Sequence, residues 1–452
     1  MGNLFGTDGI RGVANEFPLT PELAVKVGRA VVSTFPANTK QTQIVIGKDT
    51  RISGDMLEYA LASGICSMGA QAHLAGTLPT PGVAYTTASC GAAAGIVISA
   101  SHNPFYDNGI KIFDGSGNKL ADESEHKIEN IVLADQTSAG HAPISEVGDV
   151  IRLTAAAQSY KEFLKDCIAN PSAFQGMKII LDCSNGATYR IAPDLFRELG
   201  AEVAALSIRP DGKNINADCG SEHPQKLIKE VVKRKADIGL AFDGDGDRLI
   251  AVDEKGQVIS GDRILAICAD DLKQKGLLKD NLVVSTVMSN LGLRVALKKM
   301  GIRHVMTAVG DRYVLEEMRA SGAVIGGEDS GHMIFADYHT TGDGMLTALK
   351  LIEAMQTESK PLSELSKIME VFPQVLINVD VRHKPDIQTV PQVVEAIESV
   401  EKNLGEQGRV LVRYSGTQPL CRVMVEGSSE DETNRYCRQI AEIIKNNIGS
   451  EG

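Results

Sequence analysis

A chain of 452 residues is too long for one compact core, so its length predicts two to four domains. Its net charge of −12 at pH 7 argues against a nucleic-acid partner, and no apolar run is long enough to cross a membrane. Its eight cysteines show no C-x-x-C spacing and its N-terminus shows no secretory signal, which speaks against a zinc or dithiol motif and favours a cytoplasmic setting.

Short apolar strands recur along the chain, each followed by a polar or glycine-rich loop. We expect such strands within these segments: 43–51, 94–102, 177–187, 237–248, 281–292 and 322–332. Helical patterns precede three of them, at 20–35, 156–168 and 261–276. This rhythm predicts α/β domains with parallel or mixed sheets, in which ligands bind at the carboxyl ends of the strands.

The repetition of this pattern predicts three similar mixed- or parallel-sheet α/β domains, at 1–150, 151–255 and 256–368. The stretch 138–152 is expected to link the first two. From 369 to 452 the pattern changes to apolar strand runs with a helix near 388–403 and a last helix at 431–448. The sequence therefore predicts a smaller C-terminal α+β domain.

Two loops of the predicted first domain carry candidate chemistry. In LFGTDGIRG, a glycine-rich segment with Thr7, Asp8 and Arg11 can approach a ligand closely, or can be a simple capping loop. In AGIVISASHNP, an apolar strand ends in Ser-Ala-Ser-His-Asn-Pro, where Asn-Pro forces a turn. Ser101 is the candidate nucleophile there, and the alternative is an ordinary strand-ending turn.

In the sequence DGDGDR, Asp243, Asp245 and Asp247 follow an apolar strand. Three carboxylates so close together repel one another unless a cation neutralises them, and oxygen ligands suit Mg²⁺ or Ca²⁺. A calcium loop fits only in part, because its sixth position requires glycine and is Arg248 here. We favour a catalytic Mg²⁺ site over a calcium sensor or a solvated acidic turn.

Two later loops carry polar groups suited to a sugar phosphate. In VIGGEDSGHMIF, three alternating residues can share one face and bind sugar hydroxyls: Glu328, Ser330 and His332. In RYSGTQPLCR, two arginines bracket a turn that suits a phosphate dianion, with these residues: Arg413, Ser415, Gly416, Thr417 and Arg422. Each loop has a plainer interpretation, as a strand connection or a decorated β-turn.

Six motifs stand in the order in which the α-D-phosphohexomutases carry them: GTDGIRG, SASHNPFYDNGIK, FDGDGDR, GGEDSGH, DYHTTGDG and RYSGTQP. The chain therefore resembles this family from end to end, and most closely its bacterial members that act on glucosamine phosphates. The resemblance implies four domains around a central cleft, which in chain order bear the phosphoserine and bind metal, sugar and phosphate. It also implies interconversion of glucosamine 6-phosphate and glucosamine 1-phosphate for cell-wall precursors, through a hexose 1,6-bisphosphate.

The resemblance assigns a role to each candidate residue. Ser101 resembles the phosphoserine, flanked by His102 and Lys111. One Mg²⁺ would be held by a phosphate oxygen on Ser101 and by three carboxylates, those of Asp243, Asp245 and Asp247. Arg11 and Arg248 would stabilise the charge of the transferring group. The sugar would meet Glu328, Ser330 and His332, and the non-reacting phosphate would meet Arg413, Ser415, Gly416, Thr417 and Arg422.

Three residues depart from the family pattern: Asp329, which bears on the sugar preference, and Tyr414 and Gln418 in the phosphate loop, where the loss of a charge at 418 should not weaken phosphate binding. Other functions remain open at this point. One is a phosphoglucomutase or phosphomannomutase that acts on glucose or mannose phosphates, and another is a phosphatase that uses the same serine and metal. A third is a non-catalytic protein that binds calcium or a sugar phosphate. The expected partner is a small sugar phosphate, with neither nucleic acid nor membrane, and the chain is expected to be a monomer or a homodimer.

Overall fold

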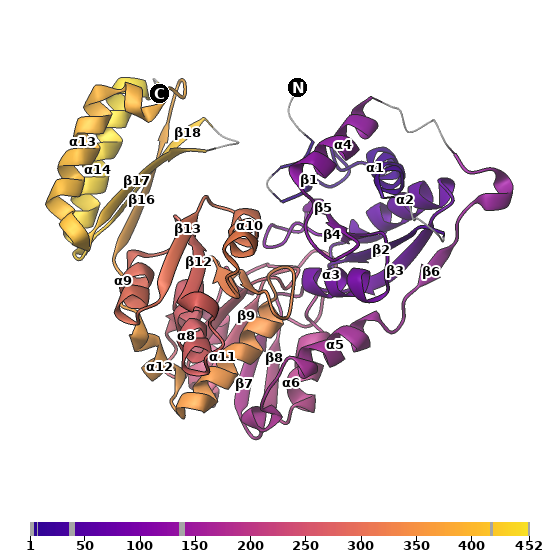
Figure 1. Ribbon diagram of the computed structural model, residues 1–452, viewed down its shortest axis with the longest axis horizontal. Helices are drawn as coiled ribbons and strands as arrows, with labels where there is room; N and C mark the ends of the chain where they lie inside the picture. The colour runs from indigo at the N-terminus through magenta and orange to yellow at the C-terminus, as the bar shows by residue number, and fades with distance from the viewer. Residues whose placement is uncertain (1–3, 7, 36–40, 135–140, 416–418, 451–452) are drawn as a thin grey trace. The chain divides into compact units, whose positions relative to one another are not determined.

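The computed structural model describes residues 4–6, 8–35, 41–134, 141–415 and 419–450 (Figure 1). Contacts divide the chain into two compact units, one of Met1–Met288 with Ile302–Ile368 and the other of Ser289–Gly301 with Met369–Gly452. Each unit is described by itself below. The segments predicted as α/β lie in the first unit except for residues 289–301, which belong to the second unit together with the predicted α+β tail.

The first unit begins with a six-stranded sheet in the order β1-β5-β4-β2-β3-β6. Its strands are β1 Ile10–Val13, β2 Gln43–Lys48, β3 Gln71–Thr77, β4 Ala94–Ile98, β5 Asp107–Asp114 and β6 Val150–Arg152. Four of them, β4, β2, β3 and β6, are parallel, whereas β5 is antiparallel to both β4 and β1. The predicted linker 138–152 therefore ends in a strand that extends this sheet, while residues 138–140 lie outside the described residues.

Helices cover both faces of this sheet: α1 Pro21–Thr34, α2 Gly54–Ser67, α3 Thr80–Ser89 and α4 Asp122–Leu133. Ile44 and Ile46 of β2 face the core shared with α1 and α2. Strand alternation turns Gly47 to the other face, where an added Cβ would lie 2.3 Å from Val83 of α3. This glycine therefore lets α3 pack directly on the sheet and brings Thr80, the first residue of α3, to the strands' carboxyl edge.

Two further mixed sheets complete the first unit. The second has the order β11-β10-β9-β7-β8 and the third the order β13-β12-β14-β15. In both, central strands are parallel and the strand after the polar loop turns back antiparallel, as β10 does beside β9 and β15 beside β14. The predicted mixed or parallel α/β sheets are confirmed.

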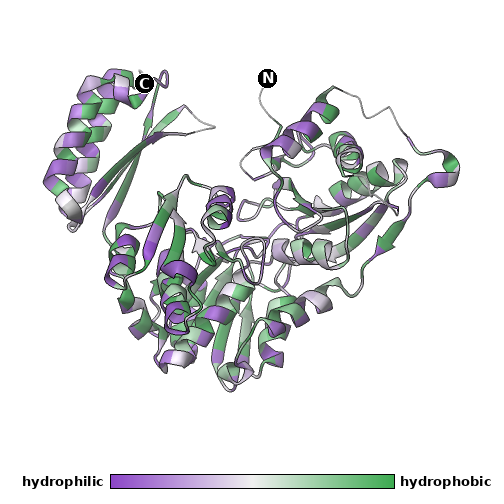
Figure 2. Ribbon diagram, in the orientation of Figure 1, coloured by the Kyte–Doolittle hydropathy of each residue, from purple (hydrophilic) through white to green (hydrophobic). Residues whose placement is uncertain are grey.

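The strands of these sheets are β7 Lys178–Asp182, β8 Glu202–Leu206, β9 Ile238–Phe242, β10 Leu249–Asp253, β11 Val258–Ile259, β12 Leu282–Thr286, β13 Arg303–Thr307, β14 Ile325–Gly327 and β15 Met333–Phe335. Their helices are α5 Ala156–Asp166, α6 Ile191–Glu198, α7 Gln225–Arg234, α8 Gly261–Gln274, α10 Asp311–Ser321, α11 Gly344–Glu358 and α12 Leu362–Leu365. Short 3₁₀ turns stand at Ile144–Glu146, Pro171–Phe174, Lys279–Asn281 and Ser366–Ile368. Green hydrophobic segments are common in the strands, and the helices carry purple hydrophilic bands (Figure 2).

The second unit is a three-stranded antiparallel sheet in the order β16-β18-β17. Its elements are α9 Leu291–Lys299, β16 Gln374–Asp380, α13 Pro391–Leu404, β17 Arg409–Tyr414, β18 Leu420–Glu426 and α14 Glu430–Ile448, with 3₁₀ turns at Ile387–Thr389 and Gly405–Gln407. Alternate residues such as Val423 and Val425 pack with Val393 of α13 and Ile440 of α14 in one core. The two helices cover one face of the sheet, which confirms the predicted small α+β domain.

Every cysteine lies in a described segment and is free, and all but Cys90 are buried. In the part of the chain that the structure describes, no helix combines the length and the apolar character needed to span a membrane.

Candidate active site

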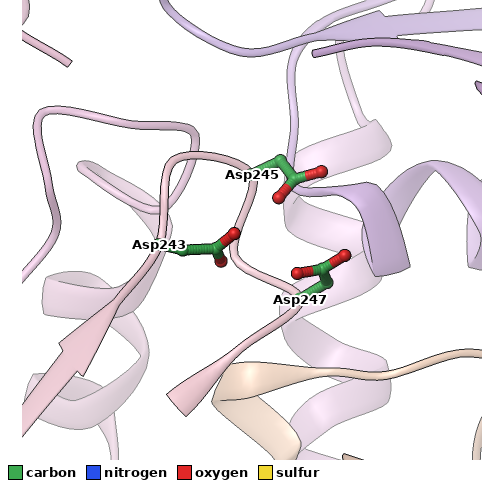
Figure 3. Close-up of side chains that lie close together, drawn as sticks. All are labelled: Asp243, Asp245 and Asp247. Carbon is green, nitrogen blue, oxygen red and sulfur yellow. The ribbon is translucent and has the colours of Figure 1, made fainter. Parts of the chain in front are cut away.

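The three predicted metal ligands lie in the tight hairpin that joins β9 to β10. Oxygen atoms of Asp243, Asp245 and Asp247 lie within 4.8 Å of one another, and all three residues are buried. Figure 3 shows the three carboxylates turned toward a common space. Gly246 makes this possible, because its positive φ of 73° reverses the chain between the second and third aspartate.

The charge of this cluster is only partly compensated by the protein. Burial, together with the neighbouring carboxylates, raises the pKa of Asp243 well above its usual value. Burial acts in the same direction on Asp245, but the charge of Lys111 and the side-chain hydrogen bonds to this carboxyl, that of Thr80 among them, together outweigh burial and lower its pKa. Oδ1 of Asp245 and Oδ1 of Asp247 are buried and have no hydrogen-bond partner among the residues that the structure describes. Buried oxygens without partners, in an all-carboxylate set, fit a hard divalent cation such as Mg²⁺.

Ser101 stands beside this cluster, in the loop after β4. Its Oγ donates to Oδ2 of Asp243 at 2.5 Å, and Nδ1 of His102 lies 3.4 Å from the same Oγ. The backbone of Ser101 is in the left-handed region, with φ of 52°, a conformation that costs energy outside glycine. Arg51 and Asn216 both donate to the Ser101 carbonyl at 2.9 Å and hold it there.

Ser99, the other hydroxyl of this motif, supports the turn. Its Oγ donates to Asp49 at 2.6 Å and accepts from the Ser101 backbone N–H at 3.0 Å. The Ser101 hydroxyl points instead to the aspartate cluster. The geometry therefore distinguishes a serine at the candidate reaction centre from a serine that orders the loop.

Four basic residues surround the cluster. Nζ of Lys111, on β5, lies 2.9 Å from Asp245, 3.0 Å from Asp8 and 3.5 Å from Asp247. Burial lowers the pKa of Lys111, but these carboxylates raise it well above its usual value, so the amine stays charged. Arg11, on β1, pairs with Asp8.

The remaining two basic residues are His102, which follows Ser101 in the chain, and Arg248, which follows Asp247. Nε of Arg248 lies 3.9 Å from Asp247 and has no hydrogen-bond partner within the described ranges. Burial and the nearby charge of Arg248 lower the pKa of His102, so its imidazole is neutral near pH 7. A neutral imidazole beside a hydroxyl can accept a proton from it.

The predicted sugar loop connects β14 to β15 and lies against the hairpin that carries the three aspartates. The Leu249 N–H donates to the Gly331 carbonyl at 3.1 Å, and Arg248 and His332 form an isolated β-bridge. Among the described residues, Ser330 Oγ and both ring nitrogens of His332 are buried without hydrogen-bond partners, and burial raises the pKa of Glu328. Ser330 Oγ and Nδ1 of His332 are therefore available for a ligand, whereas Oε1 of Glu328 accepts from the Gly310 N–H and Nε2 of His332 lies 3.4 Å from Asp311.

Asp329 lies in the same loop but is exposed. Its Oδ1 lies 3.4 Å from the Asp262 N–H at the start of α8, and its own carbonyl accepts from the Gly261 N–H at 3.0 Å. The side chain therefore caps α8 instead of joining the unpartnered groups of the loop.

In the second unit, Arg413 of β17 and Arg422 of β18 are directly opposite each other in the antiparallel register. Burial and the facing guanidinium of Arg422 lower the pKa of Arg413, and Nε of Arg422 is buried without a hydrogen-bond partner in the described part of the chain. Two opposed cations destabilise a strand pair unless an anion lies between them. Ser415 follows and accepts at its carbonyl from Lys384 at 2.5 Å, whereas the predicted Gly416 and Thr417 lie outside the described residues.

The structure adds residues that the sequence did not single out. Thr80 Oγ1 donates to Asp245 at 2.6 Å, Lys119 contacts both Asp8 and Asp311, and Lys384 joins the Ser415 turn. No local pattern marks Thr80 or Lys119, because their partners stand more than a hundred positions away in the chain. Arg51 could have been found from the sequence, because it lies in GKDTR, a polar loop that follows an apolar strand.

Comparisons with known proteins agree with this arrangement. Four family models match in order, described as phosphoglucomutase/phosphomannomutase alpha/beta/alpha domain I (residues 2–139), domain II (158–256), domain III (260–372) and C-terminal domain (376–443). The phosphoglucosamine mutase of Syntrophus aciditrophicus is 59% identical over 99% of this chain and 100% of its own. That of Pelobacter propionicus is 52% identical over the full length of both chains.

Solved structures show the same fold. A phosphoglucomutase/phosphomannomutase family protein from Burkholderia thailandensis superposes with a TM-score of 0.80 at 25% identity, over 98% of this chain and 97% of its own. A putative phosphomannomutase from Thermus thermophilus gives 0.79 at 24% identity, over 98% and 99%. Taken with the four matching domain models and the full-length relatives, these findings establish that the chain belongs to the phosphoglucomutase/phosphomannomutase family.

Proposed function

We propose that this protein interconverts glucosamine 6-phosphate and glucosamine 1-phosphate by way of a phosphoserine at Ser101. The observation that carries the proposal is the position of the Ser101 hydroxyl, 2.5 Å from Asp243 and beside the two carboxylates with unpartnered oxygens. Full-length relatives named phosphoglucosamine mutase support the choice of substrate. The proposal includes one Mg²⁺ at the aspartate cluster and a hexose 1,6-bisphosphate that forms during turnover.

The reaction consists of two phosphoryl transfers. In the first, the bond between phosphorus and Ser101 Oγ breaks and a bond to a sugar oxygen forms, while the sugar hydroxyl gives up its proton. The bisphosphate then turns over in the site, and the other phosphate returns to Ser101 Oγ, which leaves the isomeric monophosphate. The Mg²⁺, when bound, supplies positive charge beside the transferring phosphoryl group.

This chain's own residues supply the remaining functions. The neutral imidazole of His102 is placed to take up a proton next to Ser101. Lys111, Arg11 and Arg248 add fixed positive charge around the transferring group. The unpartnered groups of Ser330 and His332, with Glu328, are the proposed sugar contacts.

The non-reacting phosphate is assigned to the opposed arginines of the second unit, because a dianion removes their mutual repulsion. The proposal keeps Ser415, Gly416 and Thr417 in this phosphate loop. It also places the reaction in the cytoplasm, in keeping with eight unpaired cysteines.

The test uses the full chain with Mg²⁺ and a trace of glucose 1,6-bisphosphate. Glucosamine, glucose and mannose 6-phosphates are supplied separately, and 1-phosphates and free phosphate are measured by ³¹P NMR. We expect glucosamine 6-phosphate to give the highest kcat/KM, without net release of phosphate. Glucose or mannose 6-phosphate as the best substrate would reassign the protein within its family, and phosphate release without isomer would indicate a phosphatase.

A matched pair of serine variants tests the phosphoserine. Intact-mass analysis after incubation with the bisphosphate should show one added phosphoryl group on the wild type and on Ser99→Ala, but none on Ser101→Ala. Full turnover by Ser101→Ala would refute the proposed mechanism. Ser99 is a suitable control because it lies two residues away and orders the same loop.

A further inference from the structure

A chain of charged side chains connects the residues around the metal cluster to the sugar loop. Nζ of Lys111 lies 3.0 Å from Oδ2 of Asp8, whose Oδ1 lies 2.5 Å from Nζ of Lys119. Lys119 also contacts the carboxylate of Asp311, and Oδ2 of Asp311 lies 3.4 Å from Nε2 of His332. Cation and anion alternate from Lys111 to Asp311, and the imidazole of His332 ends the chain.

The members of this chain are sheltered from solvent. The side chains of Lys119 and Asp311 are 13% and 14% exposed, and that of Lys111 is 2% exposed. Charges at such depth are stable only when they are paired, and removing one partner leaves the other uncompensated. Asp8 is also paired with Lys111 and Arg11, whereas Asp311 faces Lys119, so Lys119 is the link that joins the two carboxylates.

Lys119 and Asp311 belong to different parts of the first unit. Lys119 follows β5 of the first sheet, whereas Asp311 is the first residue of α10, which packs on the third sheet. Further polar contacts join these parts: Arg312 donates to the Leu120 carbonyl at 2.9 Å, and Arg319 donates to Asn118. Figure 1 shows α10 at this border, next to the loops of the first sheet. Polar interfaces between domains resemble transient ones and allow relative motion.

The N-terminus of α10 is tied to the sugar loop at two points. The Gly310 N–H donates to Oε1 of Glu328 at 3.2 Å, and Asp311 lies beside His332. A displacement of α10 relative to Lys119 therefore moves both proposed sugar contacts relative to Ser101. Since phosphoryl transfer is sensitive to misplacement on the scale of one ångström, this register matters for the reaction.

We propose that Lys119 and Asp311 are positioning residues that hold the sugar loop in register with Ser101 and the metal cluster, so that the bisphosphate stays bound between the two transfers. This inference rests on the proposed function. The intermediate must turn over without leaving, and the link across the interface keeps the two sides of its site together while it turns. Loss of the link gives the intermediate a route to escape.

The variants for the test are Lys119→Met and Asp311→Asn, with Arg319→Gln as the matched control. Arg319 also donates from α10 to the same loop of the first sheet, but among the described residues it pairs with no member of the charged chain. We expect kcat/KM to fall by about tenfold to a hundredfold in the two test variants. The amount of bisphosphate released per turnover should rise at least as steeply, and Arg319→Gln should match the wild type in both.

Two further variants separate positioning from simple interface stability. Lys119→Arg keeps the cation and should restore most of the retention of bisphosphate. The charge swap Lys119→Glu with Asp311→Lys should not restore it, because a carboxylate at 119 faces Asp8. A lower kcat/KM in Lys119→Met with an unchanged release of bisphosphate would overturn the proposal, as would a Lys119→Arg protein that retains bisphosphate no better than Lys119→Met.

A measurement without substrate keeps this inference distinct from the proposed function. Hydrogen–deuterium exchange of the segment 324–335 should be faster in Lys119→Met than in the wild type, and unchanged in Arg319→Gln. Equal exchange in all three proteins would refute the link whatever the activity. If the wild type isomerises no hexose phosphate, the proposed function falls, while the exchange result still decides whether Lys119 orders the sugar loop.

Discussion

Thr80→Val should weaken the binding of Mg²⁺ to the aspartate cluster. Thr80 is the first residue of α3 and is fully buried, and its Oγ1 donates to Oδ2 of Asp245 at 2.6 Å. Valine has nearly the same shape but cannot donate, so the substitution removes one hydrogen bond and leaves the packing of α3 in place. Asp245 then keeps only Lys111 on that oxygen, at 2.9 Å.

The size of the effect follows from the charge of the acceptor. A hydrogen bond to a charged group contributes about 1.5–3 kcal/mol, and the remaining lysine contact favours the lower end of that range. About 1.5–2 kcal/mol corresponds to a roughly tenfold to thirtyfold weaker affinity, similar to the loss seen when groups behind metal ligands are removed. The Thr80 hydroxyl binds Oδ2 of Asp245 and so orients the carboxylate. Among the described residues Oδ1 of Asp245 then has no hydrogen-bond partner, and it remains free for the metal.

Isothermal titration of Mg²⁺ into the wild type, Thr80→Val and Thr80→Ser measures this directly, without a need for turnover. Thr80→Ser keeps the hydroxyl and loses one methyl group, so it should bind Mg²⁺ within about threefold of the wild type. An unchanged affinity in a folded Thr80→Val protein would refute the reasoning. An equal loss in Thr80→Ser would assign the effect to packing instead of the hydrogen bond.

Three further predictions concern the remaining charged groups. Asp245→Asn should lower kcat by about a thousandfold or more, and activity of the wild type should vanish with a chelator and return with Mg²⁺; full activity without a divalent metal would contradict the site. Arg413→Gln should raise KM about tenfold with a smaller change in kcat. It should also stabilise the second unit by about 0.2–1 kcal/mol, because it removes the repulsion between Arg413 and Arg422. A lower kcat at constant KM would place Arg413 at the reacting phosphate. Burial raises the pKa of Asp343 to about 6 from 3.8, so the wild type loses stability as the pH rises through this range. In urea unfolding, the free energy of unfolding of Asp343→Asn should therefore rise by up to about 3 kcal/mol relative to that of the wild type between pH 4 and pH 7. A difference in unfolding free energy that does not change with pH would refute the shift.

The sequence alone was sufficient for features that depend on near neighbours. An apolar strand followed by alternating aspartates places three carboxylates in one turn, and the structure gathers Asp243, Asp245 and Asp247 as expected. The strand-then-loop pattern likewise predicted the mixed sheets and a serine at the end of β4. In these cases the interacting groups are separated by few residues, so local backbone geometry brings them together.

Tertiary structure decided which distant groups complete the site. The contacts of Thr80 with Asp245 and of Lys119 with Asp311 join residues 165 and 192 positions apart. The orientation of Asp329 toward α8, and the use of 150–152 as a strand instead of a linker, depend on how a neighbouring element packs. The opposition of Arg413 to Arg422 depends on the register of a hairpin. Hydrophobic periodicity specifies which face of an element is buried, but which element it packs against, and in which register, emerges only when the whole unit is assembled.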